Sequence, residues 1–239
     1  DRRQRYLFEY FNSYPLKVRK RVEYVTTEMY RPYIDLAKKV FPNADIVVDK
    51  FHIVQLLTRE LNKLRINEMK KLNSRSREYK VLKRYWKIPL TRKRELNSIY
   101  FFKNRHFKNM TSSVDILDYM LKEFPNLKEA YDFYQNFLLS ISKNDVAMLE
   151  DILNTRTDKI PMCFRKSIKS LKKYVLNSLK YDYTNAMVEG KNNKIKVIKR
   201  VSYGYRSFRN FKARIMLMER YKIQKGNIHS YQFAMDAAA

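Results

Sequence analysis

The scarcity of glycine and proline constrains this chain more than any other feature of its sequence. The 239 residues include only three glycines, at positions 190, 204 and 226, and six prolines. Turns and helix ends are usually marked by these two residue types, so their scarcity favours long helices and few tight turns. Hydrophobic residues make up 45% of the chain, which is enough for a core in one domain or in two closely joined ones.

Apolar periodicity predicts a short α/β part followed by a long helical block. Residues 22–27 and 45–49 are rich in β-forming residues and are interpreted as strands, with a helix over 30–40 between them. This order predicts a parallel pair of strands. Beyond residue 52, no convincing strand is found before about residue 181, and Ser112 with Asp115 resembles a capping box. The other predicted helices cover residues 3–14, 52–72, 76–88, 113–123, 126–141, 144–154, 163–180, 188–200 and 207–223.

The positive charge of the chain is large and uneven. The formal net charge is +27, and such a field favours phosphate-rich partners, most often nucleic acid. Residues 59–108 hold 17 Lys and Arg against 4 acids, and residues 189–225 hold 12 against 2. Residues 111–160 between them hold 5 against 9. A general compositional bias, which is the alternative interpretation, would have made all three segments basic.

Cysteine usage and hydropathy give the expected setting of the chain. Cys163 is the single cysteine, so no disulfide within the chain can form, and a reduced, cytoplasmic setting is expected. No local motif surrounds Cys163, which favours a small buried residue over a nucleophile. No run of 18 apolar residues is present, so no membrane partner is expected.

One carboxylate stands at the head of a strongly basic helix near the C-terminus. Glu189 is followed by Gly190 and then by cations, with no further acid before residue 219. A solvated helix face would usually intersperse acids among its cations, so contacts with phosphates are favoured. Gly190 is equally consistent with a close approach of phosphate and with a helix irregularity. The residues that we predict to bind DNA are Lys191, Lys194, Lys196, Lys199, Arg200, Arg206 and Arg209.

Aromatic residues interleave with the cations after this helix. Tyr203, Tyr205 and Phe208 flank Arg206. Aromatic rings next to cations are suited to stacking on unpaired bases, although the same rings are equally consistent with a place in the core.

Two further carboxylates follow the predicted strands. Glu28 comes just after the first strand and Asp49 ends the second. Ligands of two-metal phosphoryl-transfer sites converge as carboxylates, and in α/β sheets such groups lie at the carboxyl ends of strands. Glu189 can join them from its helix, although each acid alone is more often a cap or a surface group. His52 lacks a nearby cysteine or second histidine and is interpreted as structural.

Several motifs resemble those of a known family. They are Ile46-Val-Val-Asp-Lys-Phe-His-Ile-Val, Val188-Glu-Gly-Lys-Asn-Asn-Lys-Ile-Lys-Val-Ile-Lys-Arg, Tyr203-Gly-Tyr-Arg, Asn210-Phe-Lys-Ala-Arg-Ile and Arg84-Tyr-Trp-Lys. Together they resemble bacterial insertion-sequence transposases of the DDE superfamily, in the group written ISL-three, over about residues 2–222. The resemblance implies an RNase H-like catalytic core interrupted by an all-helical insertion before its last acid. It also implies cleavage of element ends and their joining to target DNA by a homo-oligomer.

The resemblance also implies a metal site and a division of the chain. Family members use Mg²⁺, with Mn²⁺ as a substitute, bound by two Asp and one Glu; Glu189 matches the final Glu. The catalytic and metal-binding candidates are therefore Glu189, Glu28 and Asp49. Residues 1–54 and 184–225 would belong to the catalytic core, residues 55–183 to the insertion, and residues 226–239 to a flexible tail. A bacterial protein associated with the nucleoid is expected.

The sequence departs from the family pattern in two ways. Glu28 stands where the family has its second Asp, which lengthens this ligand by one methylene. The first Asp of the family would lie upstream of residue 1, so we expect a truncated fragment that is inactive alone unless Asp49 takes over this role. Two other functions stay open: a non-catalytic DNA-binding protein derived from a transposase, and an RNA-binding helical protein.

The charge of the Glu189 helix leads to a measurable expectation. Neutralising Lys194, Lys196, Lys199 and Arg200 together should weaken binding to DNA of every sequence, because phosphate contacts do not read bases. The slope of log affinity against log salt concentration should fall by roughly 0.9 for each phosphate contact that is lost. A filter-binding or anisotropy titration at several salt concentrations measures this slope, and an unchanged slope would contradict the assignment.

Overall fold

The computed structural model describes residues 3–156, 159–181, 183, 185–223 and 233–235. Their contacts divide the chain into two compact units, residues 1–184 and residues 185–239. Each unit is described by itself below. In the described part of the chain, no helix is both long enough and apolar enough to cross a membrane.

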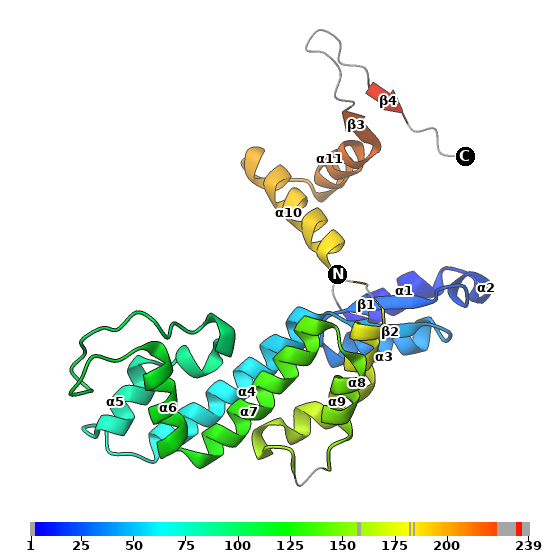
Figure 1. Ribbon diagram of the computed structural model, residues 1–239. Coiled ribbons are helices and arrows are strands. Elements are labelled where there is room, and N and C mark those ends of the chain that lie inside the picture. The colour runs from blue at the N-terminus through cyan, green and yellow to red at the C-terminus, as the bar shows by residue number, and fades with distance from the viewer. Residues whose placement is uncertain (1–2, 157–158, 182, 184, 224–232, 236–239) are drawn as a thin grey trace. The chain divides into compact units, whose positions relative to one another are not determined.

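The first unit begins with helices and a small parallel sheet (Figure 1). Strands β1 (Tyr24–Thr27) and β2 (Asp45–Val48) pair in parallel, with Thr27 opposite Val48. Helix α3 (Arg31–Val40) connects them, as the sequence predicts. Residues 46–48 are all buried, which is typical of a parallel strand that is covered on both faces. Two further helices, α1 (Gln4–Asn12) and α2 (Leu16–Arg19), precede the sheet.

Three long helices form the body of this unit. They are α4 (Lys50–Lys70), α7 (Pro125–Lys143) and α9 (Met162–Lys180), and each packs against the other two. Figure 1 shows α4 and α7 lying side by side along most of their length. The shorter elements around them are α5 (Arg77–Arg84), η1 (Ile88–Leu90), η2 (Lys93–Glu95), α6 (Ser113–Glu123) and α8 (Val146–Asn154).

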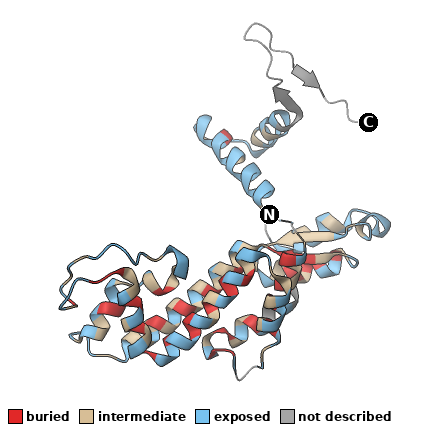
Figure 2. Cartoon of the chain, in the orientation of Figure 1, coloured by how far each residue is buried: buried red, intermediate tan, exposed pale blue. Residues whose placement is uncertain are grey.

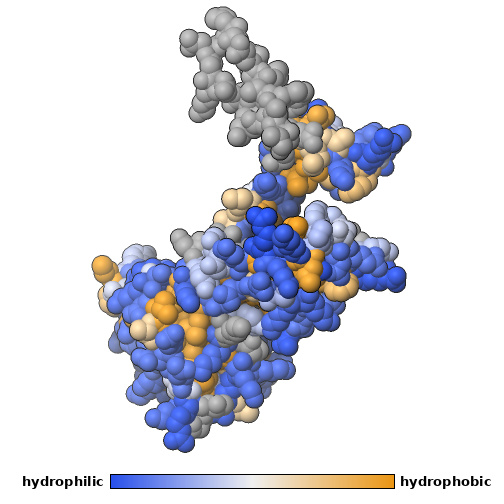
Figure 3. All heavy atoms as spheres, turned by 90° about the vertical axis from the view of Figure 1, so that its right-hand side faces the viewer, coloured by the Kyte–Doolittle hydropathy of each residue, from blue (hydrophilic) through white to orange (hydrophobic). Residues whose placement is uncertain are grey.

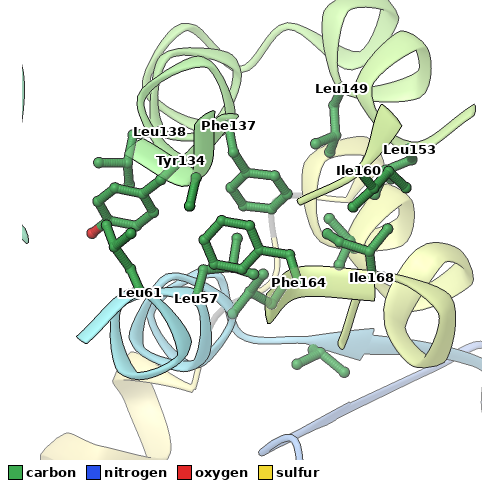
Figure 4. Packing of buried hydrophobic residues seen from close by; sticks show 14 of the residues in the cluster. Leu57, Leu61, Tyr134, Phe137, Leu138, Leu149, Leu153, Ile160, Phe164 and Ile168 are labelled. Carbon is green, nitrogen blue, oxygen red and sulfur yellow. The ribbon is translucent and has the colours of Figure 1, made fainter. Parts of the chain in front are cut away.

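Aromatic and leucine side chains fill the space between these helices (Figure 4). Leu57 from α4, Phe137 from α7 and Phe164 from α9 are each fully buried and meet at the centre. The rings of Phe133 and Phe164 stack with their centroids 5.3 Å apart. Figure 2 shows the buried residues along the facing sides of the long helices and exposed residues on their outer sides. This one-sided burial explains why apolar spacing alone locates the helices.

Helix α9 joins the helical block to the sheet. The Asn177 side-chain amide donates to the carbonyl oxygen of Ile46 at 3.0 Å, and the Tyr181 hydroxyl donates to the Asp45 carboxylate at 3.0 Å. Ile46 and Val48 belong to the same apolar cluster as Phe164. The sheet and the helical block therefore share one continuous core.

The chain between α5 and α6 differs from its prediction. The helix predicted over residues 76–88 ends at Arg84, because Pro89 has no amide hydrogen to donate to the carbonyl oxygen of Tyr85, and the 3₁₀ turn η1 follows. Apart from η2, the backbone is then irregular as far as Ser112, with one isolated bridge between Phe102 and Thr111. Apart from this bridge, the described residues from 52 to 181 contain no strand, as predicted. The predicted capping box is confirmed: Ser112 and Asp115 bond each other's backbone amides.

The second unit contains α10 (Ala186–Val201), α11 (Phe208–Arg220), β3 (Tyr221–Ile223) and β4 (Phe233–Met235). The prediction of one helix over residues 207–223 is wrong at its end, since the last three residues form β3 and pair antiparallel with β4. Apart from β4, the tail predicted from residue 226 onward lies outside the described residues.

The central aromatic contact gives a stability prediction. Phe164→Ala should lower the free energy of unfolding by about 3–5 kcal/mol, because it removes a fully buried ring and leaves a cavity. Met162→Ala is the matched control, since Met162 lies on the same helix and is exposed; it should change stability by less than about 0.5 kcal/mol. Urea denaturation monitored by circular dichroism measures both, and equal effects would show that α9 does not pack as described.

Candidate nucleic-acid and metal site

The parallel pairing brings two predicted acids to the same edge of the sheet. Thr27 of β1 stands opposite Val48 of β2, so Glu28 and Asp49 are the first residues beyond neighbouring strand ends. Glu28 is exposed and Asp49 is partly buried. The backbone turns sharply after Glu28, whose carbonyl oxygen accepts from the amide of Tyr30 at 2.7 Å. Two carboxylates thus leave the sheet at equivalent positions, as the sequence predicts.

Asp49 also has a structural role. Its Oδ1 accepts from the backbone amide of Phe51 at 2.8 Å and caps the first turn of α4. An Asp at this position stabilises a helix by about 1 kcal/mol relative to Ala. The neighbouring Lys50 ammonium donates to the Asn144 side chain at 3.0 Å, where α7 ends in a left-handed residue. The strand end and the end of α7 are therefore held together.

Phe51 and His52 lie next to this edge. Phe51 is exposed to 64%, although it follows the buried strand β2 directly. Its ring lies 5.6 Å from the His52 ring at an interplanar angle of 72°, an edge-to-face contact. His52 is partly buried in the first turn of α4. The sequence did not single out Phe51 or Asn144, because neither has a side chain with acid–base or metal chemistry of its own.

The donor chemistry at this edge fits a hard divalent cation. Carboxylate oxygens are the side-chain ligands that Mg²⁺ takes in proteins, usually one or two of them. Glu28 and Asp49 supply this number. Over the described ranges, no three His, Cys, Asp or Glu side chains come together in a cluster that could hold a metal. Glu189, the third ligand predicted from the sequence, belongs to the second unit, which is described separately.

Glu189 lies in the first turn of α10 and is exposed. Its backbone amide donates to the carbonyl oxygen of Asn185 at 2.9 Å. A carboxylate near the positive end of the helix dipole is stabilised there, so its position has a local cause as well. A Cβ at Gly190 would meet no atom within 4 Å in this unit, although glycine within a helix costs about 1 kcal/mol relative to alanine. Packing inside the unit does not explain Gly190.

The cations predicted to bind phosphates are exposed on α10 and after it. Lys194 donates to the carbonyl oxygen of Met218 at 3.2 Å, which links α10 to α11. Apolar side chains lie among them, and Figure 3 shows orange patches beside blue ones on this unit. Ile198 is the buried residue of α10 in the part of the helix that the structure describes. The exposed cations are Lys191, Lys194, Lys196, Lys199, Arg200, Arg206 and Arg209.

The turn after α10 holds a tyrosine in a conformation that favours glycine. Tyr203 has φ 52° and is fully exposed, at 102%. The amide of Gly204 donates to the carbonyl of Lys199 and that of Tyr203 to Arg200, both at 3.0 Å, which is the Schellman pattern of a helix end. A left-handed residue with a side chain costs about 1–2 kcal/mol. Stability therefore does not account for a tyrosine here.

The other aromatics of the turn divide into two groups. Tyr205 packs its ring 4.9 Å from that of Phe211, and its hydroxyl lies 2.8 Å from the Ser202 hydroxyl. It therefore belongs to the contact between the turn and α11. Tyr203 and Phe208, by contrast, are exposed, as are Arg206 and Arg209, which are near them in the sequence. Of the two interpretations from the sequence, packing fits Tyr205, and an available stacking surface fits Tyr203 and Phe208.

Cys163 is not part of this chemistry. It is partly buried against the apolar core, and burial raises the pKa of its thiol to about 12. At neutral pH it is a protonated thiol, which is a poor nucleophile.

Comparison with known proteins gives one family and one relative. A family of transposases, the ISL3 (ISL-three) group of DDE transposases, matches residues 1–215. A protein of Lactococcus lactis subsp. lactis named "ATP-dependent protease" is 38% identical over 121 residues, which are 49% of this chain and 38% of that protein. The chain thus spans well under half the length of this relative. No solved structure was found to match the chain.

The left-handed tyrosine allows a direct test of its local cost. Tyr203→Gly should stabilise the last turn of α10 by about 1 kcal/mol, which slows amide exchange there about fivefold. Hydrogen exchange followed by mass spectrometry measures this change on peptides covering residues 195–204. Tyr205→Gly is the control, because Tyr205 packs on Phe211 and its loss should speed exchange. Slower exchange in both variants, or in neither, would contradict this account.

Proposed function

Because this chain belongs to the transposase family of the ISL3 group, we propose that it cleaves insertion-sequence ends and joins them to target DNA. The observation that carries the proposal is the arrangement of α10. One exposed carboxylate, Glu189, stands at the start of a helix whose remaining charged side chains are all cations. Cations hold the phosphate backbone, and a carboxylate beside them is the group needed to bind a metal at the scissile phosphate.

The sheet edge would supply the other two carboxylates. Glu28 and Asp49 leave neighbouring parallel strands at equivalent positions, so both can face one ligand. We propose that these two residues and Glu189 hold Mg²⁺, which Mn²⁺ can replace. When bound, the metal would activate the attacking oxygen and neutralise charge on the phosphate. Asp49 is the better positioned of the two, since capping of α4 fixes its side chain.

The remaining parts of the chain have roles that follow from this arrangement. The catalytic core, of RNase H-like type, would include residues 1–54 and 184–225, and residues 55–183 would be the insertion between its acids. Tyr203 and Phe208 would contact bases exposed at a cleaved or distorted end, because rings beside cations stack on unpaired bases. Arg200 and Arg206 would hold the adjoining phosphates. DNA is the partner, and we expect a homo-oligomer to act on it.

No observation favours the activity in the relative's name. A nucleotide-binding loop of the common type needs closely spaced glycines before a Lys and a Ser or Thr. The three glycines of this sequence lie at 190, 204 and 226 and do not provide that spacing. The match also covers only 38% of that protein, so most of its sequence has no counterpart in the alignment.

Substitutions at Asp49 separate its structural role from its proposed metal role. Asp49→Asn keeps a good helix cap and should leave the free energy of unfolding within about 0.5 kcal/mol, whereas Asp49→Ala should lower it by about 1 kcal/mol. Both variants, and Glu189→Gln, should weaken Mn²⁺ binding by about tenfold or more. Loss of a residue that only hydrogen-bonds to a metal ligand already lowers metal affinity by about 10–100-fold, and loss of a ligand should cost at least as much. Mn²⁺-dependent relaxation of water protons measures the affinity without requiring catalysis.

The control and the functional assay use the same proteins. Glu150→Gln removes an exposed acid of α8 and should not change Mn²⁺ affinity. Strand cleavage of labelled duplex DNA in Mg²⁺ or Mn²⁺ should be lost in Glu189→Gln while DNA binding is retained. Equal Mn²⁺ affinity in all variants, with DNA binding retained, would instead indicate a DNA-binding protein that has lost its catalytic site.

A further inference from the structure

A second basic surface lies in the helical block, far along the chain from α10. It consists of α5 and the irregular segment from Tyr85 to Met110, and we call it the α5 surface. In Figure 1 this segment arcs over α5 and α6 at one end of the long helices. Between residues 75 and 108 the sequence has 12 Lys and Arg against two acids. The roles proposed for Glu189, Glu28 and Asp49 do not involve it.

The cations of the α5 surface are gathered in space as well as in sequence. Burial lowers the pKa of His106, and the nearby charges of Arg105, Arg84, Lys80 and Arg77 lower it further. Cations from α5 and from the later segment therefore lie near His106, and the Arg77 guanidinium lies over the ring of the neighbouring Phe107. Among the described residues, none of the cations on α5 forms a salt bridge with a carboxylate. Such a concentration of like charge is unfavourable unless a polyanion neutralises it.

The two acids of this region are already engaged. Glu78 accepts a hydrogen bond from the Tyr119 hydroxyl at 3.1 Å, and Glu95 lies 3.8 Å from Arg92. Two acids offset only a small part of the charge of the 12 Lys and Arg between residues 75 and 108.

Exposed aromatic rings accompany these cations. Trp86 is exposed to 42%, Tyr100 to 67% and Phe101 to 47%. Lys87 lies 5.5 Å from the centroid of the Trp86 ring, and Arg84 lies 5.8 Å from that of Tyr85. Large aromatic side chains are enriched on surfaces that bind partners, where they supply much of the contact area. Aromatic faces with cations beside them are the features that take up successive unpaired bases.

The surface is held in place by internal contacts. The buried Arg65 of α4 donates to the carbonyl oxygen of Leu82 on α5 at 2.7 Å. The rings of Phe107 and Tyr119 contact each other edge to face, and the Arg77 guanidinium lies against both, 4.7 Å and 4.5 Å from their centroids. These contacts fix α5 relative to α4, α6 and the later segment. An ordered surface loses less conformational entropy when it binds.

We propose that the α5 surface binds a single-stranded segment of DNA. Its cations contact the phosphates, and Trp86 with Tyr100 and Phe101 stack on the bases. The bases of an intact duplex are stacked on one another and do not offer their faces, so duplex DNA would engage the cations alone. That the nucleic acid is DNA rests on the proposed function. An acidic protein would match the cations but would leave the rings without a stacking partner.

The single tryptophan of the chain makes the test direct. Titration of the full chain with an unlabelled thymidine oligonucleotide should quench the fluorescence of Trp86, because a stacked base contacts its ring. Duplex DNA of equal length should also bind, which is measured by the fluorescence anisotropy of a labelled strand. It should quench the fluorescence of Trp86 only slightly. Binding of the single strand without any change in Trp86 fluorescence would overturn the proposal.

Variants distinguish this surface from α10. Tyr100→Ala with Phe101→Ala should lower affinity for single strands about tenfold and leave affinity for duplex unchanged. Tyr10→Ala is the matched control, since it removes an exposed aromatic ring on α1. Neutralising Lys194, Lys196, Lys199 and Arg200 should instead weaken duplex binding. If that change weakens duplex binding while the aromatic variant changes nothing, the α5 surface proposal fails and the proposed function stands.

Two further ligands test the chemistry of recognition. Polyglutamate of comparable length should not quench Trp86 fluorescence at a salt concentration where the oligonucleotide does. Equal quenching by both would show that the surface binds anions in general, and would overturn the proposal. Uridine oligonucleotides that bind more tightly than thymidine ones would overturn the assignment to DNA. Lys80→Gln with Lys83→Gln and Lys87→Gln should reduce the salt slope for single strands by up to roughly 2 units, at about 0.7 per contact.

Discussion

Helix α9 packs against both the other long helices and the small sheet, and the first unit depends on this double contact. On one side Phe164 closes the space between α4 and α7. Further along the helix, Asn177 and Tyr181 bond to β2. A two-stranded sheet has too little surface to be stable alone, so the helical block supplies the core that the sheet lacks. The same packing fixes the strand ends, and with them the positions of Glu28 and Asp49.

The excess of cations sets the second constraint. A net charge of +27 opposes compact structure through self-repulsion. At α10 the cations follow a single carboxylate, and a left-handed tyrosine extends into solvent beside them. At α5 they surround exposed rings. Both surfaces retain features that cost stability in the free protein, and the proposed binding of nucleic acid would account for them.

Sequence patterns predicted the elements well where burial is one-sided. The parallel strands, the long helices and the capping box at Ser112 followed from apolar spacing and local side-chain chemistry. The segment from Tyr85 to Met110 was not predicted in detail, because its shape depends on contacts with α5 and α6 that spacing does not encode. The sequence placed Glu28 and Asp49 at strand ends and left a capping role open for each, and Asp49 does cap α4. It did not indicate that Tyr203 is left-handed.

We propose that Glu189 completes a metal site with Glu28 and Asp49 on DNA. The most direct measurement is the distance between spin labels at Phe51→Cys and Met187→Cys, both exposed neighbours of the acids, in a chain carrying Cys163→Ser. In the presence of DNA and Mg²⁺, pulsed electron resonance should give one short and narrow distance distribution. A long or broad distribution that DNA and Mg²⁺ leave unchanged would contradict the claim, because the third carboxylate would not reach the sheet edge.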